Sequence, residues 1–136
     1  MPKTTVAAII HNDQAQVLLT RRNIPPFKGL WILPGGHIDD YEAAQTAIVR
    51  EVKEETGLDF AAIFFGYFDE IIPDMGIHAV VIVFAGTPSG QAIADGLEVS
   101  ELAWFSLDEA RALELGFQHN LILDAFAQSI NLDSAK

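Results

Sequence analysis

The chain has no cysteine and few basic residues, and both absences restrict what it can be. Without cysteine, it has neither disulfides nor thiolate zinc sites. Eight lysines and arginines stand against nineteen aspartates and glutamates, and the formal net charge of −11 argues against binding to the phosphate backbone of a long nucleic acid. No apolar run reaches the ~18 residues that span a bilayer, and residues 1–10 do not read as a signal peptide. We therefore expect a cytoplasmic protein with no membrane or nucleic-acid partner.

The length and the hydrophobic pattern predict one α/β domain. With 136 residues, half of them hydrophobic, the chain fits a single domain over residues 1–136 that buries roughly two-thirds of its unfolded surface. Five apolar, β-prone segments are predicted as strands, the first two forming a hairpin. These are residues 4–10, 17–22, 60–68, 78–85 and 102–105. A capping box from Ser106 to Glu109 and an amphipathic pattern over 120–130 predict helices between and after the strands, so we expect a mixed sheet with distributed helices.

Three glutamates lie within one helical turn of each other. Glu51, Glu54 and Glu55 have the i, i+3 and i+4 spacing that places side chains on one face. Like charges at this spacing repel, and each pair costs a bare helix ~0.2–0.5 kcal/mol. Carboxylate oxygens are the ligands that Mg²⁺ or Mn²⁺ prefers, usually shared with substrate phosphates. The spacing therefore predicts a divalent-cation site on this helix face.

The ends of this glutamate helix are also marked in the sequence. Asp39 or Asp40 is expected to cap its start, and Gly57 is expected to end it. Ile48, Val49 and Val52 are expected to anchor its opposite face in the core. Upstream, residues 34–36 read Pro-Gly-Gly, which predicts a tight turn whose backbone can approach a ligand or metal closely.

The whole segment from Gly36 to Leu58 resembles the signature of the Nudix hydrolase family. Gly36 is followed after five residues by Glu42, and after seven more by Arg-Glu-Val-Lys-Glu-Glu-Thr-Gly-Leu over residues 50–58. The resemblance implies an α/β/α sandwich that hydrolyses the diphosphate of a nucleoside diphosphate linked to another group. Family members often have glycine just before the first glutamate, whereas this chain has Tyr41, which leaves the shape of that loop open.

The resemblance also implies roles for individual residues. In the family pattern the residues at these positions bind the metal, so Glu51, Glu54 and Glu55 are expected to be ligands, with the Gly36 carbonyl as a further one. Arg50 would orient the glutamates, and its i, i+4 spacing to Glu54 supports that role independently. The cations would offset the charge of the diphosphate and activate the attacking water. The sequence leaves open the number of metal ions.

The sequence also leaves open which carboxylate accepts the proton from the attacking water. Family members place this general base either within the glutamate helix or on a later loop. Glu51 is the candidate on the helix, and Glu98 and Glu101 are the candidates on the loop.

Candidate substrate contacts lie on both sides of the glycine turn. Arg21 and Arg22 end a predicted strand and could anchor a phosphate, although only one of two neighbouring strand residues can face the site. Phe27 and Trp31 are candidates to stack on a nucleobase, with core packing equally expected for them. His37 follows the double glycine and is expected near substrate, while the other three histidines are expected to be structural or exposed.

Two resemblances within the family give different substrates. Pro73, fifteen residues after Leu58, and the segment 115–119 resemble short ADP-ribose pyrophosphatases. The segment 35–38 instead resembles triphosphate pyrophosphatases that remove oxidised nucleotides. We expect Mg²⁺-dependent cleavage of ADP-ribose or a nucleotide sugar to AMP and a sugar phosphate. The alternatives are a nucleoside triphosphate pyrophosphohydrolase and, in another class, a non-catalytic nucleotide sensor. A homodimer is left open.

Overall fold

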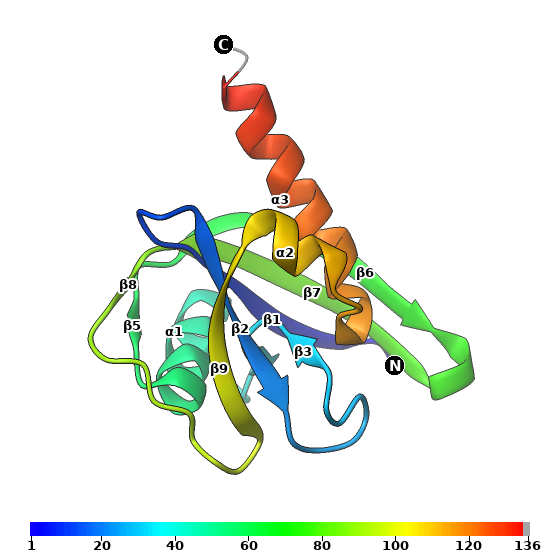
Figure 1. Cartoon of the computed structure of the whole chain (residues 1–136). Helices are drawn as coiled ribbons and strands as arrows, with labels where there is room; N and C mark the ends of the chain where they lie inside the picture. Colours follow the sequence, from blue (N-terminus) through cyan, green and yellow to red (C-terminus); the bar gives the residue numbers. More distant parts are fainter. Residues whose placement is uncertain (135–136) are drawn as a thin grey trace.

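The computed structural model of the chain describes residues 1–134, and these form a mixed sheet, an antiparallel sheet and a small β-pair (Figure 1). In the mixed sheet β1 pairs in parallel with β7, while β4 and β6 are antiparallel outer strands in the order β4-β1-β7-β6. The strands of this sheet are β1 (Lys3–Ile10), β4 (Gly35–His37), β6 (Ile63–Ile72) and β7 (Ile77–Gly86). The antiparallel sheet has the order β3-β2-β9, with β2 (Gln16–Arg22), β3 (Trp31–Ile32) and β9 (Val99–Ser106). The small pair is β5 (Asp59–Phe60) with β8 (Pro88–Ser89).

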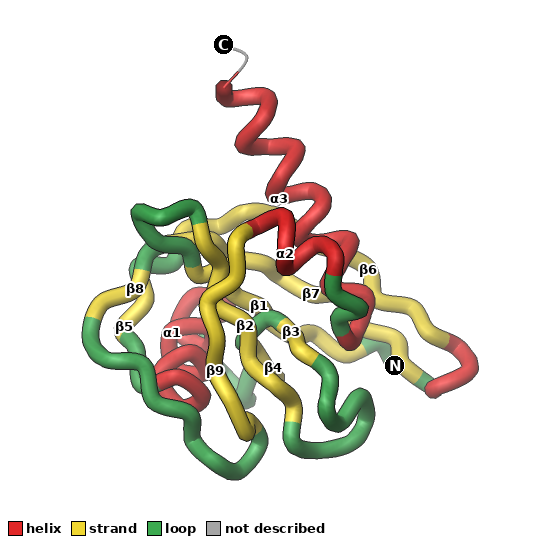
Figure 2. The backbone as a smooth tube through the Cα atoms, viewed as in Figure 1, coloured by secondary structure: helices red, strands yellow, loops and turns green. Residues whose placement is uncertain are grey.

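Helices cover both faces of the sheets, as Figures 1 and 2 show. They are α1 (Ala44–Thr56), α2 (Leu107–Ala112) and α3 (His119–Ser134), with short 3₁₀ turns η1 (Pro73–Met75) and η2 (Gly116–Gln118). Successive residues of a strand point to opposite faces, so β1 supplies two cores. Val6, Ala8 and Ile10 pack with Ile48 and Val52 of α1 in one core.

The second core lies on the α3 side of the same strands. There Ala7 and Ile9 of β1 pack with Leu123 and Phe126 of α3. Because both faces of β1 are buried, the strand is apolar almost throughout instead of alternating. The α/β/α sandwich with a mixed sheet predicted from the sequence is confirmed.

Several predicted elements have different limits or partners in the structure. The hairpin between the first two strands is wrong: β1 and β2 belong to different sheets and share only an isolated bridge from His11 to Val17. The predicted strand 60–68 is divided, because Phe60 pairs within β5 and β6 continues to Ile72.

The start of α1 also differs from the prediction, whereas its end does not. Neither aspartate caps the helix: Ala43 is the N-cap residue and makes no side-chain cap. Val49 is 38% exposed rather than in the core. Gly57 ends α1 as predicted, with φ of 74° and its N–H donating to the Lys53 carbonyl, a conformation that favours glycine.

The capping box at α2 is confirmed. The Ser106 hydroxyl accepts from the Glu109 N–H, and the Glu109 carboxylate accepts from the Ser106 N–H. Among residues 1–134, no helix is long and apolar enough to cross a membrane.

Candidate active site

Arg50 is the centre of a cluster of carboxylates on α1 and the loop before it. Its Nη1 donates to Glu51 at 3.0 Å and to Glu54 at 3.2 Å, and its Nε and Nη2 donate to the two oxygens of Glu42 at 2.8 and 2.9 Å. Nη2 also donates to the His37 carbonyl at 3.1 Å. The guanidinium therefore fixes the loop and two of the three predicted metal ligands, and the predicted pair with Glu54 is present.

The charges in this cluster shift each other's ionisation. The hydrogen bonds from Arg50, together with the Asp39 N–H, lower the pKa of Glu42 to about 2. The carboxylates around Arg50 in turn raise the pKa of the guanidinium, and the hydrogen bond to Glu42 has the largest effect. Both groups therefore stay charged across the physiological range, which keeps the cluster ordered.

Glu51 lies directly against the glycine turn. A Cβ added to Gly36 would meet the Glu51 carboxylate at 2.6–2.7 Å, so only glycine leaves room for this side chain. Burial raises the pKa of Glu51, against the opposing effect of Arg50. The double glycine thus brings the backbone and a partly desolvated carboxylate together.

Glu55 is the most buried of the three helix glutamates, at 4% exposed. Its Oε2 accepts from the Gly35 N–H at 3.1 Å, which ties α1 to β4. Burial, reinforced by the charge of Glu51, raises the pKa of Glu55 well above its usual value. A positive charge beside these two carboxylates would favour their ionised forms.

The donor set suits a hard divalent cation. All predicted ligands are oxygens. Glu51 shares the charge of Arg50 with other carboxylates, and Glu55 accepts from a neutral backbone N–H. Within residues 1–134, however, no three acidic or histidine side chains converge on one point. Glu54, whose side chain is 58% exposed, turns toward Arg50 instead. The ligand set of Gly36 and the three glutamates therefore stays a prediction, with a donor chemistry that fits it.

The loop between β8 and β9 brings Glu98 toward this cluster and leaves Glu101 outside it. Glu98 raises the pKa of both Glu51 and Glu55 through its charge. Glu101 lies on β9 and pairs with Arg21 at 2.9 Å. Asp95, which the sequence did not suggest, also acts on Glu55, while its carboxylate accepts the Leu97 and Val99 N–H groups and so shapes the loop.

The two neighbouring arginines point in different directions. Arg21 pairs with Glu101 and donates to the Gly29 carbonyl, so its charge is already used. Arg22 donates to the Pro26 carbonyl at 2.6 Å, and its guanidinium lies 4.8 Å from the centre of the Phe117 ring. Burial lowers its pKa, while the charges of Glu98 and Glu55 raise it. Of the two arginines, Arg22 is the one that lines the cavity beside the glycine turn and interacts electrostatically with Glu55 and Glu98.

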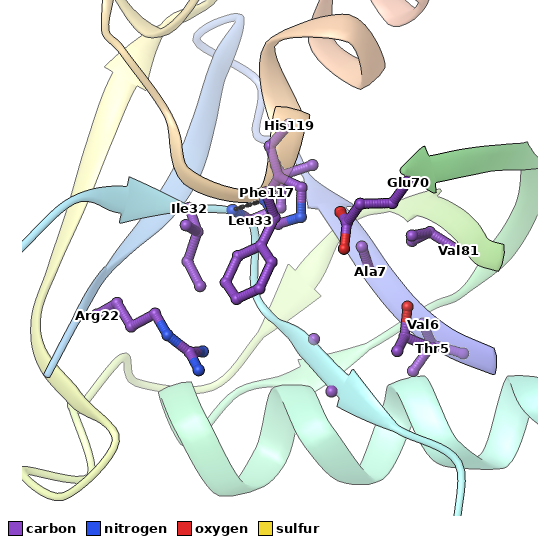
Figure 3. A pocket seen from close by; sticks show the side chains of 12 residues that line it. Thr5, Val6, Ala7, Arg22, Ile32, Leu33, Glu70, Val81, Phe117 and His119 are labelled. Carbon is purple, nitrogen blue, oxygen red and sulfur yellow. Dashed lines mark hydrogen bonds between the residues drawn. The ribbon is translucent and has the colours of Figure 1, made fainter. Parts of the chain in front are cut away.

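A cavity of about 80 Å³ lies beside the glycine turn, between β1 and η2 (Figure 3). It opens toward a cleft of about 400 Å³ that shares Thr5, Arg22, Glu70 and Phe117 with it. The remaining cavity lining is Val6, Ala7, Ile32, Leu33, Gly35, Gly36, Val81 and His119. The cavity thus connects the double glycine with residues from β6, β7 and η2.

The other predicted substrate residues occupy different places. His37 is exposed and lines the larger cleft. Phe27 packs edge-on against Phe117, with ring centroids 4.7 Å apart, and so supports the cavity wall. Trp31 packs against Phe105 and the core on the α3 side, and it is not among the residues that line the cavity or the cleft.

Sequence reasoning missed Glu70 as a site residue and assigned His119 only a structural or exposed position. Glu70 is 7% exposed, and burial raises its pKa to about 7. The His119 Nδ1 accepts from the Leu33 N–H at 3.0 Å, and burial lowers the pKa of this histidine to about 3, so it is neutral. A signal for Glu70 does exist in the sequence, because it is an acidic residue within the apolar run 63–72.

Tyr41 departs from the family pattern in a way that the backbone explains. Its φ is 64°, in the left-handed region where glycine is favoured, and its side chain is fully exposed. The loop thus keeps the conformation that suits glycine with a tyrosine in place.

Comparison with known proteins places the chain in one family. The family model of the NUDIX domain matches residues 1–126. The ADP-ribose pyrophosphatase of Methanocaldococcus jannaschii is 34% identical over 123 residues, which are 90% of this chain and 71% of that protein. A putative 8-oxo-dGTP diphosphatase of Bacillus subtilis is 38% identical over 99 residues, 72% of this chain and 62% of that protein. The NUDIX domain of Shewanella oneidensis NrtR, solved in complex with ADP ribose, has a TM-score of 0.84 at 25% identity, covering 96% of this chain and 89% of the other.

The sandwich, the arginine-ordered glutamates and these relatives define the class as a pyrophosphohydrolase that acts on phosphoanhydride bonds. The chain belongs to the Nudix family. Nudix hydrolases generally need divalent metal ions.

Proposed function

We propose that the chain hydrolyses the diphosphate of ADP-ribose or a similar nucleotide sugar, with Mg²⁺, to give AMP and a sugar phosphate. Support comes from two comparisons: the relative named ADP-ribose pyrophosphatase, and the Nudix domain solved with ADP ribose. The proposed substrate is a small molecule rather than a long nucleic acid, which agrees with the strongly acidic composition of the chain.

The observation that carries this choice is the small number of cations at the cavity. Arg22 is the one lysine or arginine among the described residues that line it. Arg21 is paired with Glu101 and so adds little free charge. A triphosphate brings more negative charge than a diphosphate that ends in a neutral sugar, and an acidic protein neutralises that extra charge poorly. The site therefore favours a substrate with a neutral group beyond the diphosphate.

The chain's own residues have distinct roles in this proposal. The Gly36 carbonyl and the three helix glutamates would hold Mg²⁺, which when bound offsets the diphosphate charge and favours attack by water. Arg50 orients Glu51 and Glu54 for this purpose. Glu98, whose charge acts on both Glu51 and Glu55, is the favoured proton acceptor, and Glu51 is the alternative on the helix. Arg22 contacts the phosphates from the opposite side.

A nucleoside triphosphate is the second candidate substrate. The Bacillus subtilis relative named as a putative 8-oxo-dGTP diphosphatase, at 38% identity, favours it. A non-catalytic nucleotide sensor is a third possible function, but all the glutamates of the Nudix signature are present, which argues against it.

A substrate panel tests the proposal directly. The purified chain with Mg²⁺ is assayed for kcat/KM on ADP-ribose, another nucleotide sugar, dGTP and 8-oxo-dGTP, with product identification. We expect ADP-ribose or the nucleotide sugar to give the highest value, with AMP among the products of ADP-ribose. A higher kcat/KM on a triphosphate would promote the second candidate, and tight binding of ADP-ribose without turnover would indicate a sensor.

Arginine variants provide the matched comparison for the charge argument. Replacing Arg22 by Gln should reduce triphosphate cleavage about ten-fold more than ADP-ribose cleavage, because a triphosphate depends more on this cation. Arg21→Gln is the neighbouring control and should leave the ratio unchanged. Equal losses on both substrates in Arg22→Gln would contradict the argument.

A further inference from the structure

Glu70 is a largely buried residue whose carboxyl group opens into a cavity and has no hydrogen-bond donor among the described residues. It is 7% exposed on β6, and no residue of the described chain donates a hydrogen bond to it. Among the described residues no side-chain oxygen or nitrogen is both buried and without a partner, so the oxygens of Glu70 are open to the cavity rather than sealed in the core. Glu70 also lies outside the carboxylate cluster around Arg50, so that chemistry does not explain it. Its carboxyl group projects into the cavity beside the glycine turn (Figure 3).

His119 supplies a hydrogen-bond donor to the same cavity. Its Nδ1 accepts the Leu33 N–H at 3.0 Å, so the neutral ring carries its proton on Nε2. No described residue accepts from Nε2, and the ring lines the cavity with Glu70. The cavity thus presents one acceptor and one donor from opposite elements, β6 and the start of α3.

Apart from Arg22, Thr5 and the two glycines, the rest of the cavity lining is apolar. The Phe117 ring lies between Arg22 and Glu70 in Figure 3 and separates the positive side of the site from the carboxyl side. The other apolar lining residues are Val6, Ala7, Ile32, Leu33 and Val81. A phosphate belongs on the Arg22 side, because Glu70 would repel it. The side of Glu70 suits a neutral, planar group that carries a donor beside an acceptor.

We propose that Glu70 and His119 read the edge of an adenine base. The exocyclic amine at C6 donates to Glu70, and the neighbouring ring nitrogen accepts from the His119 Nε2–H. Phe117 contacts the face of the base, and Arg22 lies toward the phosphates. This assignment rests on the proposed function, since it names the part of an adenine nucleotide that the cavity recognises. The hydroxyls of a ribose offer similar donors and acceptors, and the experiment separates the two sources.

The test measures binding of nucleotide fragments without metal, so that it does not depend on turnover. AMP, purine riboside 5′-monophosphate, which lacks the C6 amine, and ribose 5-phosphate are titrated into the protein by calorimetry. The wild type is compared with Glu70→Leu and with the conservative Glu70→Gln. Asp69→Asn is the matched control, because Asp69 is the exposed neighbour on the same strand and points to the other face.

We expect the wild type and Asp69→Asn to bind AMP at least ten-fold more tightly than the analogue without the amine. At pH 8, above the pKa of about 7 of Glu70, a hydrogen bond to this charged acceptor accounts for a ratio of about ten to one hundred. Glu70→Leu should bring the ratio to within about two-fold, and Glu70→Gln should give an intermediate value. Circular dichroism of each variant confirms that it is folded.

Three results would overturn the assignment. The first is a ratio in Glu70→Leu equal to that of the wild type. The second is a loss of ribose 5-phosphate affinity in Glu70→Leu as large as the loss of AMP affinity, which would place the sugar at Glu70. The third is no binding of AMP to the wild type at millimolar concentration. A wild type that shows the expected ratio but does not cleave ADP-ribose would refute the proposed substrate and leave the reading of adenine intact.

Discussion

Replacing Glu70 by glutamine should stabilise the fold at pH 8 and change it little at pH 5. Burial raises the pKa of Glu70 from 4.5 to about 7 in the folded protein. Between these values the folded protein holds a proton that the unfolded chain releases, so the free energy of unfolding falls as pH rises through the interval. Glutamine has the same shape and cannot ionise, so the variant avoids this loss.

The size of the effect follows from the pKa interval. A rise from 4.5 to about 7 corresponds to about 3 kcal/mol at full burial. The cavity opens to a wider cleft, so solvent screening should reduce this to about 1–2 kcal/mol. The charged or titratable neighbours are Arg22 and His119 in the cavity, the Met1 amino group, Lys3, His37 and His78 in the cleft, and Asp69 on the same strand. They are present in both proteins, so their own contributions largely cancel in the comparison.

Urea unfolding of the wild type and of Glu70→Gln at pH 5, 6, 7 and 8 measures this difference. The variant's advantage should grow steadily across the series and approach its limit near pH 8. Asp69→Asn, on the exposed face of the same strand, should show no such trend. A difference that is constant with pH, or largest at pH 5, would refute a raised pKa at Glu70.

Two further predictions concern the carboxylate cluster. Glu98→Gln should lower kcat about 10²-fold and keep metal affinity, because the charge of Glu98 acts on Glu51 and Glu55. Glu101→Gln should change neither kcat nor metal affinity, because Glu101 pairs with Arg21 on β9. Mg²⁺ titrations of turnover give both quantities, and wild-type rates in both variants would place the base on α1. Gly36→Ala should lower kcat/KM at least ten-fold with little change in Tm, because the new methyl displaces the end of the flexible Glu51 side chain. Gly66→Ala is the control, because its added Cβ would meet only the Phe68 ring, at an ordinary 3.9 Å. Unchanged kinetics in Gly36→Ala would show that the position of Glu51 is not critical.

The glutamate helix was predictable because its information is local. The spacing of the three glutamates, the pair of Arg50 with Glu54 and the left-handed end at Gly57 all depend on residues within a few positions of each other. The same local reading failed for the first hairpin. A turn signal near residue 12 shows where the chain reverses, but packing against β7 and β9 decides which strands pair.

The substrate side of the site depends on contacts that are distant in sequence. Glu70 reaches the cavity through the pairing of β6 with β7 and of β7 with β1, and His119 reaches it through η2 and its bond to Leu33. The directions of Arg21 and Arg22 depend on a register shift between them in the pairing with β9. Strand alternation alone gives no sign of such a shift.

Glu54→Gln shows whether carboxylates on α1 bind a divalent cation for diphosphate hydrolysis. Glu54 is largely exposed, so losing its bond to Arg50 should cost little stability. Turnover of the best substrate is measured across a Mg²⁺ titration, with the exposed Glu114→Gln as control. We expect a metal-free Tm equal to or slightly above that of the wild type, and kcat at least 10²-fold lower at every Mg²⁺ concentration. Near-wild-type kcat and Mg²⁺ dependence in Glu54→Gln would contradict the account.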